Sequence, residues 1–260
     1  MQDWDPQQYL QFKHERTQPS RDLVARIDID DPKTIIDVGC GPGNSTQILN
    51  TRWPNAVIVG LDNSEKMIER ARKDYPNQQW MVGDALTYTT NQAYDIVFSN
   101  AAIQWIPNHD VLIPRLFQLA QKNGILAIQV PANHESPLYR IIVRTSQKRK
   151  WRAFTKGYEL AITYHNAEYY YNALVSLTQK VALWETTYYH ILKSHQDLIE
   201  WYRSTAMKPI LDRLQTDERR ADFEEEVLSE SKEYYALQRD GRIIYPFKRL
   251  FFTARKSENG

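Results

Sequence analysis

The residues best placed to do chemistry in this chain are three aspartates, each at or near the end of an apolar segment. Asp37 lies within one such segment, Asp62 ends a second, and Asp84 follows a third. Carboxylates at strand ends can accept hydrogen bonds from the hydroxyl and amino groups of a nucleotide-like ligand. One such aspartate often only caps a helix or closes a turn, but three in series predict a binding site.

A glycine-rich turn directly follows the first aspartate. Its glycines, Gly39, Gly41 and Gly43, allow a tight turn and leave the main chain open to a ligand. Dinucleotide-binding folds place a G-x-G-x-x-G turn at the same position. The G-x-G-x-G spacing, with Asp37 before the first glycine, instead favours S-adenosylmethionine over NAD as the cofactor.

The predicted cofactor contacts extend this pattern along the chain. Asp62 is expected to accept hydrogen bonds from the ribose hydroxyls, Asp84 from the adenine amino group, and Arg16 to pair with the methionine carboxylate. Trp105 is expected to cover one end of the cofactor. The full predicted set is Arg16, Asp37, Gly39, Gly41, Gly43, Asp62, Asp84, Ala85, Asn100 and Trp105.

Alternating strands and helices must position these residues. Apolar runs predict strands at 35–38, 57–62, 79–84, 94–100 and 124–131, and later at 181–192 and 243–254. Helices are predicted at 4–26, 44–52, 64–74 and 109–121, the last three opened by Asn44, Ser64 and Asn108. Residues 132–176 show no clear strand. The pattern predicts a charged helical region over 194–239 that begins after Ser194. Within it, residues 217–220 are expected on a solvated helix face. The alternation predicts a doubly wound α/β fold with a mostly parallel sheet.

Length, charge and cysteine count set further bounds. The chain has 260 residues, a formal net charge of +1 and one cysteine, Cys40, so we expect neither a disulfide framework nor a metal cluster. Near-neutral charge gives no reason to expect a nucleic-acid or membrane partner. Without a signal peptide or a spanning apolar run, the expectation is a cytoplasmic protein, monomeric or weakly dimeric. We expect one domain over 1–260, with an N-terminal helical segment at 1–30, a cofactor-binding core at 31–131 and an acceptor-facing region at 132–260.

Three segments carry a resemblance to a known family. The turn at 37–46, the strand end at 60–64 and the segment at 98–107 are similar to those of class I S-adenosylmethionine-dependent methyltransferases, and the last of these to carboxylate methyltransferases. The closer resemblance, nearly full length, is to the trans-aconitate methyltransferases, and it includes 4–16, 186–190, 194–196 with Trp201, and 249–251. It implies a Rossmann-like sheet of seven strands whose last strand is antiparallel, with helical additions at the N-terminus and between the last two strands.

The resemblance also implies an activity, the esterification of a carboxylate of a small polycarboxylic acid, with trans-aconitate as the first candidate. A carboxylate is already ionised at neutral pH, so we expect no essential general acid or base. The predicted acceptor contacts are Trp105, His134, Tyr188, His190 and Arg249. The chain departs from the family at Ala132 and His134, where an acidic residue and a Trp are implied, and over 144–168.

Alternatives differ in acceptor or in class. The acceptor could be a malonyl thioester on a carrier protein, with 148–156 as a basic docking face, or the protein could bind the cofactor without turnover. The aromatic and basic run at 148–152 is interpreted as a surface helix or a lid. The glycine spacing disfavours a nicotinamide dehydrogenase, and the charge disfavours an RNA methyltransferase.

Overall fold

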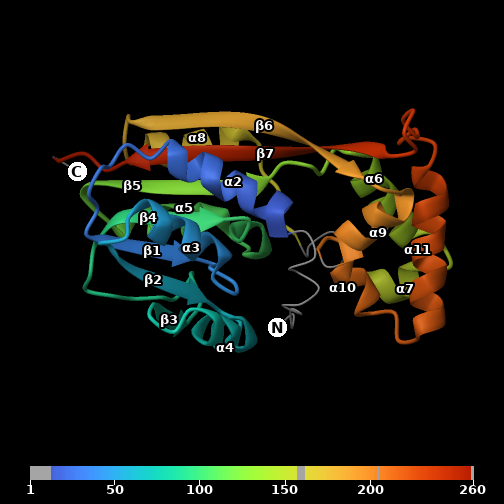
Figure 1. The fold of residues 1–260 in the computed structure, drawn as a ribbon, viewed down its shortest axis with the longest axis horizontal. Helices are drawn as coiled ribbons and strands as arrows, with labels where there is room; N and C mark the ends of the chain where they lie inside the picture. Colours follow the sequence, from blue (N-terminus) through green and yellow to red (C-terminus); the bar gives the residue numbers. More distant parts are fainter. Residues whose placement is uncertain (1–12, 157–161, 204, 259–260) are drawn as a thin grey trace.

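The computed structural model describes residues 13–156, 162–203 and 205–258, and within them side chains from residue 17 onward. A single sheet of seven strands runs through the molecule in the order β3-β2-β1-β4-β5-β7-β6 (Figure 1). The strands are β1 (Thr34–Val38), β2 (Val57–Asp62), β3 (Gln79–Val82), β4 (Tyr94–Asn100), β5 (Ala120–Pro131), β6 (Val181–Leu192) and β7 (Ile243–Arg255).

The predicted sheet is confirmed. Strands β1 to β5 are mutually parallel, while β7 runs antiparallel to both β5 and β6. The central strands are continuous apolar runs rather than alternating ones because helices cover both of their faces. The strand order reverses between β1 and β4, and in folds of this kind ligands bind at the carboxyl ends of the strands at that position.

Helices α2 (Lys13–Ala25) and α3 (Asn44–Arg52) lie on one face of the sheet, and α5 (His109–Gln118) and α8 (Ala167–Val175) on the other. Leu23 and Leu49 are fully buried on the first face, and Leu112 and Tyr170 on the second. Helix α4 (Glu65–Asp74) packs at the β2–β3 edge through Ile68 against Trp80. This layering leaves the carboxyl ends of the parallel strands uncovered by the two helical layers.

Strands β6 and β7 extend past the rest of the sheet. Strand β5 stops pairing with β7 at Pro131, opposite Arg249, yet β6 and β7 continue pairing as far as Leu192 and Ile243. Their projecting ends pack on a group of helices that we call the helical lobe (Figure 1). It comprises α6 (Pro137–Gln147), α7 (Arg152–Thr155), α9 (His195–Arg203), α10 (Lys208–Leu211) and α11 (Asp217–Ser231).

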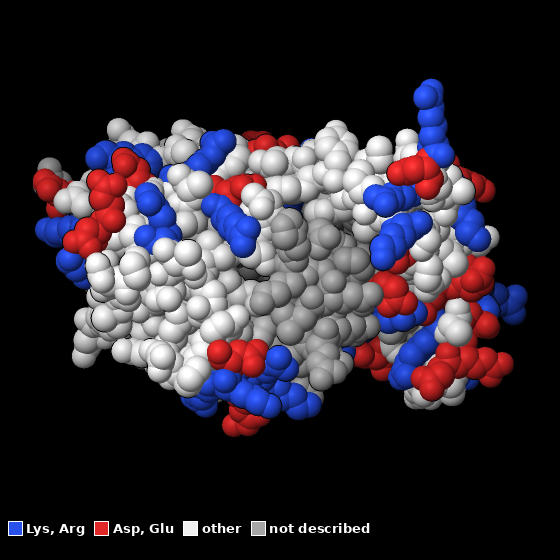
Figure 2. Space-filling model, viewed as in Figure 1, with Lys and Arg blue, Asp and Glu red and all other residues white. Residues whose placement is uncertain are grey.

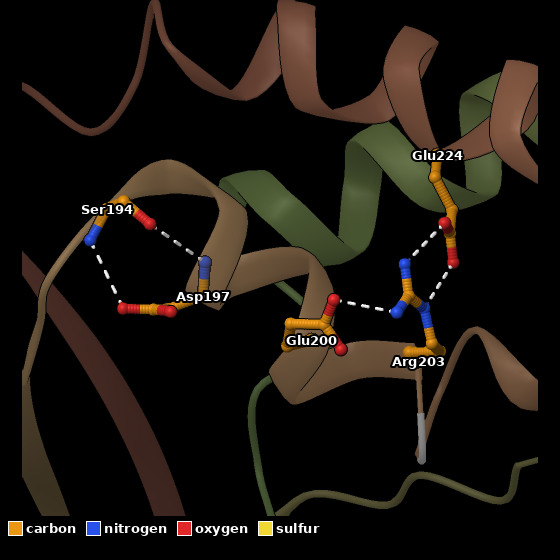
Figure 3. A network of polar contacts seen from close by, with 5 residues as sticks. All are labelled: Ser194, Asp197, Glu200, Arg203 and Glu224. Atoms are coloured by element: carbon orange, nitrogen blue, oxygen red, sulfur yellow. Dashed lines mark hydrogen bonds and ion pairs between the residues drawn. The ribbon is translucent and has the colours of Figure 1, made fainter.

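Helix α9 is held at both ends (Figure 3). At its start the Ser194 hydroxyl accepts a hydrogen bond from Asp197 N at 3.4 Å, and the Asp197 carboxylate accepts one from Ser194 N at 3.2 Å. At its end the Arg203 guanidinium donates to both carboxylate oxygens of Glu224 on α11, at 2.7 and 2.6 Å, and to Glu200 at 2.7 Å. This bidentate pair fixes the orientation of the last turn of α9.

Several predicted helix limits need correction. Of the three proposed opening residues, Ser64 caps its helix by accepting from Met67 N, whereas Gly43 holds the N-cap position before Asn44, and Asn108 makes no side-chain cap bond. Helix α5 ends at Gln118 rather than 121 because β5 already begins at Ala120. The described residues of the region 132–176 form no strand, as predicted, and contain α6, α7 and α8.

The residues at 217–220 lie on the solvent-facing part of α11, as predicted. On the face drawn in Figure 2, basic and acidic side chains alternate over the helical lobe. Within the described part of the chain, no helix has the length and apolar character needed to cross a bilayer.

Candidate functional site

An open cleft lies at the carboxyl ends of β1, β2 and β4, where the strand order reverses. It encloses about 1100 Å³, the solvent at its mouth included. Six segments form the wall. They are Thr17 and Ser20, then 38–42 with Asn44, Ser45 and Ile48, then 61–63 with Met67, then 83–85, then 100–102, and Trp105 with Ile106. Of the predicted cofactor contacts, this cleft brings together Gly39, Gly41, Asp62, Asp84, Ala85, Asn100 and Trp105.

The glycine turn forms one side of the cleft. Gly41 has φ +54°, and a Cβ at this position would meet no atom within 4 Å, so its main chain is open to a ligand. Gly43 also has positive φ, +94°, but its Cβ would come within 2.7 Å of Trp80 Cη2. Gly43 therefore packs at the start of α3 and, unlike Gly39 and Gly41, does not line the cleft.

Asp37 lies behind the turn and not in the cleft. Its carboxylate is fully buried, and one oxygen accepts hydrogen bonds from the hydroxyls of Ser45 and Thr46, both at 2.6 Å. Burial raises the pKa of Asp37 to about 6, against the lowering effect of the two hydroxyls. Asp37 thus ties β1 to the first turn of α3, and its side chain is not among those that line the cleft.

Asp62 connects the turn to the next strand while facing the cleft. One carboxylate oxygen accepts a hydrogen bond from Gly41 N at 2.9 Å, and the other accepts one from Ser64 N at 2.9 Å. Burial raises the pKa of Asp62, and the two backbone donors act against that increase. Each oxygen keeps a second lone pair, so Asp62 can accept further hydrogen bonds from a ligand with two hydroxyls.

Asp84 and Asn100 mark two other sides of the cleft. Asp84 is exposed and accepts a hydrogen bond from Leu86 N at 2.8 Å. Asn100 Oδ1 is buried, and no described residue donates a hydrogen bond to it. A buried acceptor without a hydrogen-bond donor is unfavourable unless a ligand supplies that donor. Asn100 Oδ1 is therefore suited to accept a hydrogen bond from an amino group of a ligand.

The residue after Asn100 has a strained backbone. Ala101 adopts φ +53°, which is uncommon for a residue with a Cβ. Its N–H donates to Gln129 O at 2.9 Å, and its carbonyl accepts from Gln104 Nε2 at 2.7 Å. Strain of this kind is frequently found at functional sites, and here it lies between the cleft and a second cavity.

The second cavity, which we call the aromatic cavity, encloses about 700 Å³ and shares Ala101 and Trp105 with the cleft. The remainder of its wall combines residues from β5, β7, α9 and the connecting segments. They are Gln104, Pro131, Asn133, Ile162, Tyr164, Trp201, Tyr202, Thr205, Ala206, Phe247 and Arg249. Trp105 is therefore placed between the two spaces, consistent with its two predicted roles.

Arg249 supplies positive charge to the aromatic cavity. Its side chain is 3% exposed, its guanidinium lies 4.6 Å from the centre of the Phe247 ring, and Nη1 donates to Gln129 Oε1 at 3.3 Å. Strand β7 is paired on both sides, with β5 and β6, so Arg249 is held inside the sheet. A buried guanidinium in an aromatic wall is well suited to bind a carboxylate.

The other predicted acceptor residues lie near this cavity without lining it. Tyr188 and His190 share one face of β6, as predicted, while Tyr189 points outward and is 68% exposed. The Tyr188 hydroxyl donates to Asp22 of α2. His190 packs against Trp201, with ring centres 4.6 Å apart, and burial together with the charge of Arg249 lowers its pKa to about 4.

His134 and Arg16 complete the predicted set. The His134 ring lies 5.0 Å from that of Tyr164, centre to centre, so it supports a residue of the cavity wall. The side chain of Arg16 lies outside the described residues, as do residues 4–12 of the predicted N-terminal helix.

Sequence reasoning missed part of both walls. Asn63 and Met67 directly follow Asp62 along the chain, and proximity to a strand end could have indicated them. Asn133 follows β5 in the same way. Tyr164 and Tyr202 had no such indication, because aromatic residues in helices and loops are usually packing residues.

Comparison with known proteins adds independent findings. Residues 29–196 match the family described as a methyltransferase domain. Proteins named trans-aconitate 2-methyltransferase from Azoarcus sp. (strain BH72) and Enterobacter sp. (strain 638) are each 38% identical to the chain, over 98% of it and 99% of their own length. Solved structures share the fold, including YcgJ of Bacillus subtilis, with TM-score 0.59 and 14% identity over 93% of this chain and 99% of that one. Phosphoethanolamine N-methyltransferase 2 of Haemonchus contortus, in complex with S-adenosyl-L-methionine, has TM-score 0.56 and 16% identity over 92% of this chain and 52% of that one.

Proposed function

The chain belongs to the methyltransferase domain family, and from this membership we propose that it transfers a methyl group from S-adenosylmethionine to a carboxylate of a small polycarboxylic acid, with trans-aconitate as the first candidate. The observation that carries the proposal is the pair of adjoining spaces that share Ala101 and Trp105. One has acceptors suited to a nucleoside, and the other contains a buried arginine in an aromatic wall. Near-full-length relatives named for trans-aconitate methylation support the choice of acid.

The residues of the cleft fit the cofactor. Asp62 offers free lone pairs for the ribose hydroxyls, Asn100 Oδ1 for the amino group of the methionine end, and Gly41 leaves the main chain accessible. When bound, the cofactor supplies a methyl group on a sulfonium that an oxygen nucleophile can displace. We assign cofactor binding to residues 31–131 and acceptor binding mainly to 132–260.

The protein's contribution to the reaction is to position the acceptor and to exclude water. In-line displacement requires the reacting atoms to be held roughly 3–3.5 Å apart in the correct orientation. Trp105 lines both spaces at their junction, so its indole is placed to contact both the cofactor and the acceptor. Because a carboxylate is ionised at neutral pH, no side chain has to remove a proton from it.

Arg249 is proposed to bind a carboxylate that is not being esterified. A cation on the attacking oxygen would stabilise the ground-state charge that is lost in the transition state, and this would slow the reaction. The same cation on a distant carboxylate orients the acid without this cost. A polycarboxylic acid offers both groups, one for reaction and one for binding.

The test is a methyl-transfer assay with purified protein, labelled S-adenosylmethionine and a panel of trans-aconitate, cis-aconitate, isopropylmalate, citrate and malonate. Label is expected in a base-hydrolysable ester of trans-aconitate. Labelling of none of the acids, in a protein that binds S-adenosylhomocysteine, would contradict the proposal.

An acid carried on an acyl carrier protein is the second candidate acceptor. Arg149, Arg152 and Lys156 line a shallow depression on the outside of the lobe, and no ion pair joins them to a described acidic residue. Such a group of cations suits an acidic protein partner. Methylation of a malonyl thioester on a carrier protein, with the free acids unmodified, would favour this candidate.

A further inference from the structure

A buried histidine bonds the turn at the junction of the cleft and the aromatic cavity. That turn is the short 3₁₀ helix η1 (Ile103–Trp105), and its residue Trp105 lines both spaces. His109, the first residue of α5, is 1% exposed and lines neither space. Its ring Nε2 lies 2.8 Å from Ile103 O, the same carbonyl that accepts the closing hydrogen bond of η1 from Ile106 N at 2.9 Å. His109 therefore holds η1 through its first carbonyl.

The partners of His109 fix which of its ring nitrogens carries the proton. A backbone carbonyl can only accept a hydrogen bond, so Nε2 must carry a proton to bond Ile103 O. Burial lowers the pKa of His109, while two backbone carbonyls and the charge of Asp110 act in the opposite direction. The ring is therefore neutral at neutral pH, and its Nδ1 accepts a hydrogen bond from the Tyr170 hydroxyl, 2.9 Å away. Tyr170, on α8, thus keeps His109 in the tautomer that bonds η1.

His109 also lies next to a second segment of the aromatic cavity wall. The ring of His165 lies 5.1 Å from that of His109, centre to centre. His165 directly follows Tyr164, which lines the cavity. In the same segment, Thr163 N donates to Gln104 O of η1 at 2.8 Å. Because η1 and this segment both adjoin His109, a displacement of its ring would reach the walls of both spaces.

From this arrangement we propose that His109 is a positioning residue for methyl transfer, which holds Trp105 at the junction through the carbonyl of Ile103. The inference rests on the proposed function and adds to it a residue that lines neither space. Trp105 is placed to contact both cofactor and acceptor, so its position affects how the reacting atoms are aligned. The main binding contacts are assigned to other residues, such as Asp62 and Arg249. Loss of the His109 bond should therefore lower kcat and leave both affinities nearly unchanged.

The first test compares two substitutions of His109 itself. In His109→Gln the amide Nε2 can still donate toward Ile103 O, whereas His109→Leu has no donor. Each kcat for trans-aconitate is divided by the concentration of sites that bind S-adenosylhomocysteine, so that unfolded protein is not counted. His109→Leu is expected to lower kcat at least about 10-fold, since a misplacement of about 1 Å can cost about 100-fold in rate. His109→Gln is expected to restore kcat to within about 3-fold of wild type, and KM and the Kd for S-adenosylhomocysteine should change less than about 3-fold in both.

The second test uses a matched pair of substitutions on α8. Tyr170→Phe removes the hydroxyl that bonds His109 Nδ1, whereas Tyr169→Phe removes a neighbouring hydroxyl and keeps the ring that stacks on His165. Tyr170→Phe is expected to lower kcat about 3- to 10-fold, because the tautomer of His109 is no longer fixed. Tyr169→Phe should change kcat less than about 2-fold. Both variants retain the aromatic ring, so this pair decides the question even where His109→Leu does not fold.

A double-mutant cycle tests whether His109 acts through Trp105. The kcat of Trp105→Phe is compared with that of the double variant with His109→Leu. If the two residues act in series, the second substitution should lower kcat less than about 2-fold further. Two losses that multiply would show that His109 acts independently of Trp105, which would contradict the inference.

Three other outcomes would overturn the inference. The first is an unchanged kcat in His109→Leu and Tyr170→Phe. The second is an equal loss in His109→Gln and His109→Leu, which would mean that the donor to Ile103 O is not what matters. The third is a change confined to KM or to S-adenosylhomocysteine binding, which would place His109 in binding rather than alignment. Failure of the proposed function is distinguishable, because the wild-type protein would then esterify none of the acids, whereas this inference fails through differences between variants of an active enzyme.

Discussion

The cleft and the aromatic cavity adjoin each other, yet they are built in different ways. The cleft is formed largely by short segments at the ends of successive strands, and main-chain groups such as Gly41 N help to shape it. The aromatic cavity is formed by side chains from β5, β7, α9 and connecting segments far apart in the chain. The first depends on local turns, and the second on how the helical lobe packs against β7.

The two spaces also differ in electrostatics. Acidic side chains, Asp62 and Asp84, line the cleft, whereas Arg249 is the charged side chain among the described residues of the aromatic cavity. This division suits a ligand with hydroxyl and amino groups on one side and a carboxylate on the other. It also predicts that mutations will affect the binding of one ligand and leave that of the other unchanged.

The largest expected effect follows from removing the charge of the aromatic cavity. Arg249→Gln should raise acceptor KM by at least about 30-fold, because the loss of a buried charged partner costs about 2–5 kcal/mol. Affinity for S-adenosylhomocysteine should stay within about 3-fold of wild type. Steady-state kinetics and calorimetry measure the two quantities.

Lys248→Gln provides the control for Arg249→Gln. Lys248 is the preceding residue of β7, and its ion pair with Glu185 is about half exposed, so the substitution should leave both constants nearly unchanged. If Arg249→Gln weakened cofactor binding more than acceptor binding, the assignment of Arg249 to the acceptor would be wrong.

The next largest effect is on the pH dependence of the free energy of unfolding, to which one residue near each space contributes. The pKa of His190 is lowered from 6.5 to about 4, so this residue destabilises the fold as pH falls from 6.5 toward 4. The pKa of Asp37 is raised from 3.8 to about 6. Protonated Asp37 therefore adds to the free energy of unfolding below pH 3.8, and this stabilisation is lost as pH rises through 6. The two dependences have opposite signs in overlapping ranges, and each amounts to at most about 3 kcal/mol.

Variants can separate these two contributions. Relative to wild type, His190→Gln should flatten the fall in unfolding free energy between pH 6.5 and 4, and Asp37→Asn should make unfolding free energy rise more steeply with pH between 4 and 6. Urea denaturation at a series of pH values measures both slopes. Parallel curves for a variant and wild type would show that the residue does not titrate as described.

A smaller effect distinguishes two glycines within one turn. Gly43→Ala should lower the free energy of unfolding by about 1–3 kcal/mol, because it forces a Cβ against Trp80 at positive φ. Gly41→Ala has space for its Cβ, so it should cost about 1 kcal/mol in stability while weakening cofactor binding. Denaturant titration measures the stability of the two variants, and calorimetry measures their affinity for S-adenosylhomocysteine. A larger loss of stability in Gly41→Ala, with weaker cofactor binding in Gly43→Ala, would contradict the prediction.

The smallest expected effect concerns the ribose acceptor. Asp62→Ala should weaken S-adenosylhomocysteine binding by about 1–2 kcal/mol and leave acceptor KM nearly unchanged. Asp84→Ala serves for comparison and should have a weaker effect, because Asp84 is exposed. Unchanged cofactor affinity in Asp62→Ala would remove that residue from the ribose site.

The cleft could be predicted from sequence because its parts are local. A strand that ends in a glycine turn places Gly41 and, through the parallel neighbour, Asp62 at one edge of the sheet. The position of Asp37 and Gly43 outside the cleft lining has a different origin. Local spacing indicates that these residues belong to the turn, but the packing of α3 and Trp80 determines which of them face the ligand.

The sequence by itself determined where the strands of the parallel core lie and where the cofactor-facing turn follows the first of them, because both depend on hydrophobic periodicity and on glycine conformations within a few residues. The family followed from the same short segments. The tertiary structure alone decided that Arg249 is buried between two strands and that Tyr202 joins Asn133 and Tyr245. Those contacts join residues between 43 and 120 positions apart. Side-chain packing between distant elements, rather than any local pattern, brings such residues together.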